Sequence, residues 1–192
     1  MKKTAAILLA AGSSSRTTHP KQLFQINGKP LVQFQIEALL DANITTVYVV
    51  VGYHSHHVIE AIGSNNRVKI VLNPTPEKGM FSSLLEGIKA LTTSEERLLI
   101  HPVDVPITSS LTQLLQAEGN ILIPSFNGKN GHPIIVKSTL VQSIAKEPQQ
   151  RLDRWLERHR KMIHYIESAD SCILLNANTD EELLRYFTQR NE

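Results

Sequence analysis

The stretch best suited to chemistry runs from Ile7 to Lys21 and reads ILLAAGSSSRTTHPK. Its unbroken apolar start has no helical period and predicts a strand buried on both faces. The Ala-Ala-Gly that follows lets the backbone approach a bulky anion, and the polar run after it supplies hydroxyls, backbone N–H groups and the cations of Arg16 and Lys21. A strand that opens into such a loop is suited to binding a polyphosphate. Because the pattern matches neither the P-loop nor the dinucleotide fingerprint, a polar surface turn stays open as the alternative.

Two oxygen-bearing side chains lie where predicted strands end. Asp104 follows the predicted strand 98–103, in the turn Asp-Val-Pro, and Asn178 follows a later strand. In an open parallel sheet, ligands gather beyond the carboxyl ends of the strands. A carboxylate that faces a polyphosphate there predicts a magnesium ligand, with the amide oxygen as a second one. Each residue also has a structural interpretation, Asp104 as a turn residue and Asn178 as a helix cap.

Hydroxyl and imidazole groups mark further candidate positions. The segment 79–83, Gly-Met-Phe-Ser-Ser, opens a predicted helix with N–H groups that suit an anion or a polar base edge, although N-capping needs only one serine. His132 lies between a glycine-containing loop and a strand, and His101 is interpreted as a strand residue near the site. Without a cysteine or a fourth ligand at suitable spacing, three neighbouring histidines predict a solvated helix face rather than a metal site: His54, His56 and His57.

Strands and helices alternate along the chain, which predicts a mostly parallel sheet covered by helices on both faces. We expect a Rossmann-like, three-layer α/β sandwich that forms one domain over residues 1–192. The expected strands are 7–9, 47–51, 68–72, 98–103, 121–124, 133–136, 163–166 and 173–175. The expected helices are 30–42, 53–62, 80–91, 111–116, 140–145, 151–159 and 181–190.

Composition narrows the class of protein. The 192 residues carry a formal net charge of +2 without a basic block, which argues against a nucleic-acid partner. A single cysteine, Cys172, excludes an internal disulfide, and no apolar stretch approaches the roughly 20 residues that a membrane span needs. The start, MKKTAAILLAAGSSS, is not interpreted as a signal peptide, because its removal would delete the first strand. We therefore expect a soluble cytoplasmic protein.

Taken together, the motifs resemble those of the MobA-like nucleotidyltransferases over nearly the whole chain. The opening LLAAGSSSRTTHPKQL is similar to the family signature, and further blocks follow in the family's order: GKPLVQFQIEAL, KGMFSSLLEGI, PVDVPITSSLTQLL, GKNGHPIIV and NANTDEEL. The resemblance is strongest to the molybdenum cofactor cytidylyltransferases, which carry Ala-Ala-Gly in the loop, whereas the guanylyltransferase branch carries Ala-Gly-Gly. Ala11 therefore favours cytosine over guanine.

The resemblance implies a role for each matching position. Gly12 and the serine turn would hold the triphosphate of CTP, Arg16 and Lys21 would neutralise it and act in catalysis with Asp104, and Asp104 and Asn178 would bind Mg2+. The acceptor, molybdopterin, would lie at His132 and Asn176. The nucleotide site it implies comprises Leu9, Ala10, Ala11, Gly12, Ser13, Ser14, Ser15, Arg16, Lys21, Ser83 and Asp104.

The implied reaction is attack of a terminal phosphate of the acceptor on the α-phosphorus of CTP, with pyrophosphate leaving. Two departures from the family pattern stand out: Thr17-Thr18 replaces Met-Gly, and the block 176–179, Asn-Ala-Asn-Thr, is closer to the guanylyl branch. Three alternatives therefore stay open. They are a guanylyltransferase that uses GTP, a nucleotidyltransferase with another phosphate acceptor, and a non-catalytic protein that delivers the cofactor to a molybdenum hydroxylase.

Overall fold

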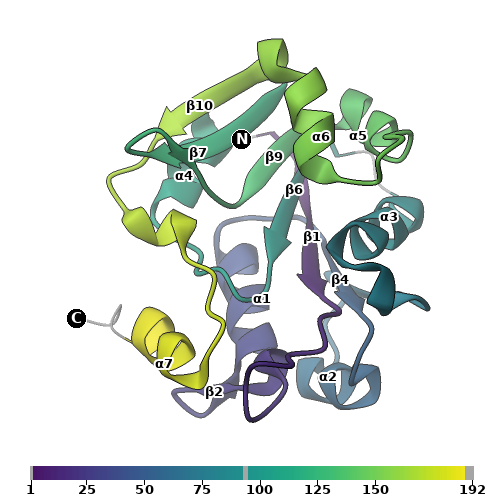
Figure 1. The fold of residues 1–192 in the computed structure, drawn as a ribbon, viewed down its shortest axis with the longest axis vertical. Coiled ribbons are helices and arrows are strands. Elements are labelled where there is room, and N and C mark those ends of the chain that lie inside the picture. Colours follow the sequence, from purple (N-terminus) through teal and green to yellow (C-terminus); the bar gives the residue numbers. More distant parts are fainter. Residues whose placement is uncertain (1, 93–94, 189–192) are drawn as a thin grey trace.

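A computed structural model describes residues 2–92 and 95–188 of the chain, and its centre is one large sheet (Figure 1). The strands lie in the order β10-β7-β9-β6-β1-β4-β5, with β8 paired to β7. Their bounds are β1 Thr4–Ala10, β4 Val47–Val51, β5 Val68–Leu72, β6 Arg97–Pro102, β7 Ile121–Phe126, β8 Lys129–Asn130, β9 Ile134–Lys137 and β10 Ile163–Glu167.

The sheet is mostly parallel, as predicted. Parallel pairing joins β1 to β4 and β6, β4 to β5, and β10 to β7. Strand β9 runs antiparallel to both of its neighbours, β6 and β7. From β1 the chain builds outward through β4 to β5 and then returns to place β6 on the other side of β1. The order therefore reverses between β1 and β6, the place where such sheets open a crevice at their carboxyl ends.

Helices cover both faces of the sheet, which confirms the three-layer α/β architecture (Figure 1). Apolar residues of α1, α2, α4 and α7 form one core with one face, and those of α3, α5 and α6 form a second core with the other. The helices are α1 Leu31–Asp41, α2 Ser55–Ile62, α3 Met80–Ala90, α4 Ser110–Gln116, α5 Ser138–Ile144, α6 Leu152–Arg158 and α7 Asp180–Thr188.

Strand β1 contributes to both cores, because successive side chains of a strand point to opposite faces. Ala6 and Leu8 belong to the core under α1, whereas Ile7 and Leu9 belong to the core under α3. All seven residues of the strand are buried. A strand that must be apolar on both sides shows no alternation in its sequence, which is why the apolar run at the start of the chain predicts a central strand.

A small hairpin leads from the loop after β1 into α1. Its strands are β2 Gln25–Ile26 and β3 Lys29–Pro30, and the turn residues Asn27 and Gly28 have φ of 51° and 76°. Asparagine and glycine tolerate positive φ at little cost, which suits this two-residue turn. The hairpin sets where α1 begins.

One element differs in type from the expected one, and several differ in extent. The strand expected at 173–175 is wrong, because η4 Ser171–Leu174 is a 3-10 helix whose first turn is capped by the Asp170 side chain accepting from the Cys172 N–H at 2.8 Å. Helix α2 begins two residues later than expected, because His54 has a left-handed φ of 59°. The last helix was expected to reach residue 190; it is described to Thr188, and the remainder lies outside the described residues. In the described ranges, no helix is long and apolar enough to cross a membrane.

The close packing of α3 on β1 generates a first prediction. A Cβ added at Gly87 would lie 2.8 Å from Cδ1 and 2.9 Å from Cγ2 of Ile7. We expect Gly87→Ala to lower the free energy of unfolding by about 1–3 kcal/mol, because overpacking outweighs the roughly 1 kcal/mol of helix propensity that alanine adds. Urea denaturation measures this. In the double variant Ile7→Ala/Gly87→Ala the clash is relieved, so the loss should be smaller than the sum of the single losses. A more stable Gly87→Ala protein would contradict the packing.

Candidate functional site

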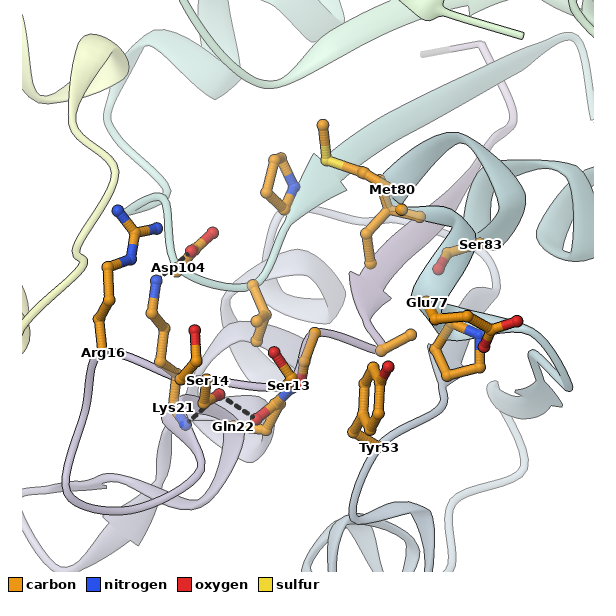
Figure 2. Close-up of a pocket in the computed structure, with 18 residues that line it drawn as sticks. Ser13, Ser14, Arg16, Lys21, Gln22, Tyr53, Glu77, Met80, Ser83 and Asp104 are labelled. Carbon is orange, nitrogen blue, oxygen red and sulfur yellow. Dashed lines mark hydrogen bonds and ion pairs between the residues drawn. The ribbon is translucent and has the colours of Figure 1, made fainter.

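A pocket of about 440 Å³ lies at the carboxyl end of β1, between the loop that follows this strand and the segments after β4, β5 and β6 (Figure 2). Arg16 and Lys21 lie at one end of it, and Tyr53 and Ser83 at the other (Figure 2). Most residues predicted for nucleotide binding line it together: Leu9, Ala11, Gly12, Ser13, Ser14, Ser15, Arg16, Lys21, Ser83 and Asp104. Ala10, predicted with them, is fully buried within β1.

The loop after β1 is shaped by its own side chains. Gln22, almost fully buried, donates through Nε2 to the carbonyls of Ala10 and Gly12, both at 2.9 Å. Its Oε1 accepts from the Ser14 hydroxyl at 3.1 Å, and Ser14 Oγ accepts from the Lys21 N–H at 2.9 Å. These bonds hold the loop in an open, curved shape. Nothing in the sequence pointed to Gln22 beyond its place beside Lys21.

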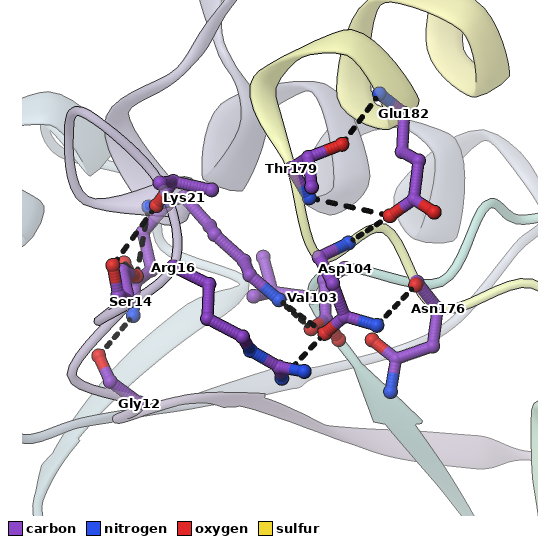
Figure 3. Close-up of polar contacts among 12 residues, drawn as sticks. Gly12, Ser14, Arg16, Lys21, Val103, Asp104, Asn176, Thr179 and Glu182 are labelled. Atoms are coloured by element: carbon purple, nitrogen blue, oxygen red, sulfur yellow. Dashed lines mark hydrogen bonds and ion pairs between the residues drawn. The ribbon is translucent and has the colours of Figure 1, made fainter.

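Cations and oxygens converge at one end of the pocket (Figure 3). Lys21 Nζ lies 2.8 Å from Asp104 Oδ2 and donates to Asn178 Oδ1 at 3.2 Å. Arg16 Nη2 donates to the same Asn178 oxygen at 2.6 Å. The Lys21 and Asp104 side chains are only 10% and 19% exposed, so water screens their charges weakly. Four residues that the sequence predicted to act together thus come from three distant segments and meet at one point.

The cap of α7 fixes the position of Asn178. Glu182 Oε2 accepts from the N–H groups of Asn178 and Thr179, at 2.7 and 3.2 Å, and the Glu182 N–H donates to Thr179 Oγ1 at 3.2 Å (Figure 3). This reciprocal pair is a capping box. Asn178 Nδ2 also donates to the carbonyl of Asn176, whose side chain is exposed. The side chain that caps α7 is thus that of Thr179, not that of Asn178 as the alternative interpretation expected, and the Asn178 amide oxygen faces the cations.

The opposite end of the pocket carries a polar network that the sequence did not reveal. Buried Asn73 donates through Nδ2 to the hydroxyl oxygens of Ser82 and Ser83, both at 2.9 Å. Ser82 uses its own hydrogen toward the carbonyls of Thr75 and Gly79. The bond from Asn73 does not use the hydrogen of Ser83, which can therefore donate into the pocket. Ser83 is suited to a ligand that presents an acceptor.

Two histidines lie behind the Asp104 end. His101 is fully buried in β6, as expected of a strand residue, and its Nε2 lies 2.8 Å from the Val105 carbonyl. A carbonyl can only accept, so this nitrogen carries the hydrogen. Burial, aided by nearby His132, lowers the pKa of His101 to about 3 against the opposing effect of that bond. Burial likewise lowers the pKa of His132 to about 4, while the Asp104 carboxylate acts to raise it.

The donor set at Asp104 fits a hard divalent cation. Its carboxylate and the Asn178 amide oxygen both face one point that the ammonium of Lys21 contacts, and oxygens are the ligands that Mg2+ and Mn2+ prefer. Among the described residues no group of three His, Cys, Asp or Glu side chains could hold a metal ion. The protein can therefore supply two ligands at this point, with phosphate and water as the others. His54, which precedes α2, and His56 and His57 within it are exposed.

The sequence matches a known family. The family model for the MobA-like NTP transferase domain matches residues 6–163. The molybdenum cofactor cytidylyltransferase of Escherichia coli (strain K12) is 25% identical over 181 residues, which cover 93% of this chain and 92% of that protein. The bifunctional protein GlmU of Syntrophomonas wolfei is 29% identical over 145 residues, 70% of this chain. The chain spans only 32% of that GlmU protein.

Solved structures share the fold. A nucleotidyl transferase from Methanothermobacter thermautotroptrophicus (Mth528) superimposes with a TM-score of 0.81 at 22% identity, covering 96% of both chains. Rv0371C from Mycobacterium tuberculosis H37Rv, in a complex with manganese, superimposes with a TM-score of 0.76 at 16% identity, covering 96% of this chain and 98% of that one. At these identities the likeness establishes the fold.

The buried imidazole of His101 generates a second prediction. Because its pKa is about 3 in the folded protein and near 6.5 in the unfolded chain, the unfolded state binds the proton first. The stability that the neutral, buried His101 contributes is therefore fully present above pH 6.5 and is lost as the pH falls toward 3. Between pH 6 and 4, the free energy of unfolding should fall more steeply in the wild type than in His101→Gln, by about 1.4 kcal/mol per pH unit.

Urea denaturation at a series of pH values measures these slopes. His164→Gln, at an exposed position on β10, is the matched control for loss of an imidazole. Parallel curves for the wild type and His101→Gln would contradict a buried neutral His101.

Proposed function

This chain belongs to the MobA-like NTP transferase domain family, and on that premise we propose that it transfers CMP from CTP to the terminal phosphate of a molybdopterin-type acceptor. The convergence of Lys21, Asp104 and Asn178 beside the loop after β1 carries the proposal, because it joins cations with metal-binding oxygens in one pocket. The similarity to the cytidylyltransferase of E. coli along almost the whole chain supports the choice of acceptor.

The loop after β1 is suited to the triphosphate. Gln22 and Ser14 hold it open, Gly12 has no heavy atom within 4 Å of where a Cβ would lie, and Ser14 has a left-handed φ of 58°. Such a turn directs successive N–H groups toward a bound anion. The cations of Arg16 and Lys21 would then leave their present oxygen partners and neutralise the phosphates. A single segment of the chain thus provides both the N–H groups that would bind the phosphates and the cations that would neutralise them.

Asp104 and Asn178 would hold a magnesium ion, for which their oxygens fit. The ion, when bound, would neutralise charge on the phosphates, as metals do in phosphoryl transfer. The chemistry asked of the chain is then positioning. An acceptor phosphate oxygen forms the new bond to the α-phosphorus, the bond from this phosphorus to the bridging oxygen breaks, and pyrophosphate leaves with that electron pair. Because the acceptor phosphate is already ionised, no general base is needed.

The acceptor would approach from the side of His132 and Asn176. His132 is close enough to Asp104 for the carboxylate to affect its pKa, and burial keeps its imidazole neutral. A neutral imidazole can recognise a polar heterocycle through hydrogen bonds without adding charge. Asn176 is exposed, and its carbonyl accepts from Asn178 Nδ2. Both positions suit recognition of the acceptor rather than the transfer step.

Two observations favour other members of the same reaction class. Asn176 and Asn178 match the guanylyl branch better than the cytidylyl branch, which favours GTP as an alternative nucleotide. The similarity to GlmU over 70% of this chain favours another acceptor for the same phosphate chemistry. In both cases the loop after β1 would still hold the triphosphate, and Asp104 would still bind the metal ion.

Removing charges at the convergence point generates a third prediction. We expect Asp104→Ala and Lys21→Ala each to lower kcat/KM by about 10²–10³ or more, because each group acts on charge that develops on the phosphates. Pyrophosphate release in magnesium measures this, and circular dichroism checks the fold. Lys137→Ala, at an exposed lysine at the end of β9, is the control and should retain activity. Equal activity of Lys21→Ala and Lys137→Ala would show that the loop does not hold the triphosphate.

The choice of nucleotide generates a fourth prediction. Ala11 lines the pocket, and its Cβ lies against Gly52, where an added Cβ would come within 2.9 Å of it. We expect the wild type to prefer CTP over GTP, since a side chain at position 11 leaves less room for a purine than glycine would. A difference of one methyl group is worth about 1–3 kcal/mol, so Ala11→Gly should relax the preference.

The experiment is a panel of CTP and GTP with molybdopterin as acceptor, and kcat/KM is measured from pyrophosphate release. A wild-type preference for GTP would replace the cytidylyl assignment by the guanylyl one. No release with either nucleotide would favour the role of a protein that delivers the cofactor to a molybdenum hydroxylase.

A further inference from the structure

The turn that carries Asp104 is held from behind by two side chains that do not line the pocket. Gln35 of α1 donates through Nε2 to the carbonyl of Val103 at 2.8 Å and to that of Val105 at 2.6 Å. His101 donates through Nε2 to the same Val105 carbonyl at 2.8 Å. The carbonyl between them, that of Asp104, accepts from the Ala177 N–H at 2.9 Å. Three consecutive carbonyls are therefore fixed by three different parts of the fold.

Burial of the polar Gln35 side chain lowers the stability of the fold. Its side chain is fully buried, on a helix face whose other buried members, including Val32, Ile36 and Leu39, are apolar. Both Nε2 hydrogens are used on the turn, yet its Oε1 is buried without a hydrogen-bond partner among the described residues. A buried amide with one unsatisfied end lowers stability. An apolar residue would pack this helix on the sheet at least as well, so helix packing does not account for Gln35.

His101 is likewise a polar side chain that is buried with one nitrogen left without a partner among the described residues. It is fully buried on the same side of β6 as Leu99, and its Nδ1 has no partner in the described part of the chain. The polar contact that the ring makes with the protein is the Nε2–H bond to Val105. Gln35 and His101 thus both direct their donors at the carbonyls that flank Asp104, one from α1 and the other from the strand that leads into the turn.

We propose that Gln35 and His101 are positioning residues that hold the Asp104 turn so that its carboxylate faces the divalent cation bound with the nucleotide. The inference rests on the proposed function, because it takes Asp104 as a metal ligand. Without Gln35 the carbonyls on both sides of Asp104 lose a donor, and the turn relaxes. The loop after β1 is built on other contacts, those of Gln22 and Ser14, and keeps its shape.

The test separates the metal from the nucleotide. Isothermal titration calorimetry compares the binding of the Mn2+–CTP complex with the binding of CTP in EDTA, in the wild type, in Gln35→Met and in the control Leu39→Met, which alters a buried residue one turn along the same helix. We expect Gln35→Met to weaken binding of Mn2+–CTP by roughly tenfold or more, as loss of groups that orient metal ligands does, and to leave binding of metal-free CTP within twofold. Leu39→Met should change neither.

Each other outcome overturns the inference in a distinct way. If Gln35→Met binds Mn2+–CTP as the wild type does, or weakens both forms of CTP equally, the residue is structural and the proposed function stands. If the wild type binds neither form, the proposed function fails and this inference fails with it.

A second pair of variants keeps the inference testable should Gln35→Met fold poorly. His101→Gln retains a side-chain N–H near the Val105 carbonyl, whereas His101→Leu does not. His101→Gln should therefore recover part of the Mn2+–CTP affinity that His101→Leu loses. Equal affinities in these two variants would count against the positioning role.

Discussion

The ion pair between Lys21 and Asp104 is the interaction on which the site depends. It joins residues 83 positions apart, and Asn178 joins the same ammonium from 157 positions away. The two charges are largely buried, and a buried charge without its partner costs several kcal/mol. The pair is possible only because β6 lies directly beside β1, so that the segments after both strands leave the sheet at the same edge. The reversal of strand order between them thus determines where the chemistry can occur.

A site of this kind places polar groups in a core that would be more stable without them. Gln35 and His101 belong to the side of the sheet where the neighbouring residues are apolar, and each keeps a buried acceptor without a partner in the described ranges. Local departures from good packing are typical of functional sites, where the surrounding core compensates for them. Around this site that core is continuous: β1 and β4 are buried along their whole length, and helices cover both faces. The stable centre of the sheet therefore compensates for the buried polar groups beside the site.

The sequence predicted what depends on local pattern. The strands at the centre of the sheet are unbroken apolar runs, and Arg16, Lys21 and Asp104 could be identified because they follow such runs. The segment 173–175 is just as apolar, but the Asp170 cap makes it a 3-10 turn, a choice that apolar content does not reveal. Gln35 could not be found at all, because its role comes from carbonyls 68 and 70 residues away. Contacts between residues so far apart produce no recognisable local pattern in the sequence.

Some residues of the site lie inside the segment that the family model matches, and others lie beyond it. The matched family segment, 6–163, contains the loop after β1, Asp104 and His132. Asn176 and Asn178 lie beyond it, in the segment that leads into α7. This segment is bonded to the turn of Asp104 through the Ala177 N–H, and to Arg16 and Lys21 through the Asn178 side chain, while Asn176 is exposed. The part of the site beyond the matched segment is therefore bonded both to the loop after β1 and to the turn of Asp104, so the three segments can only be arranged together.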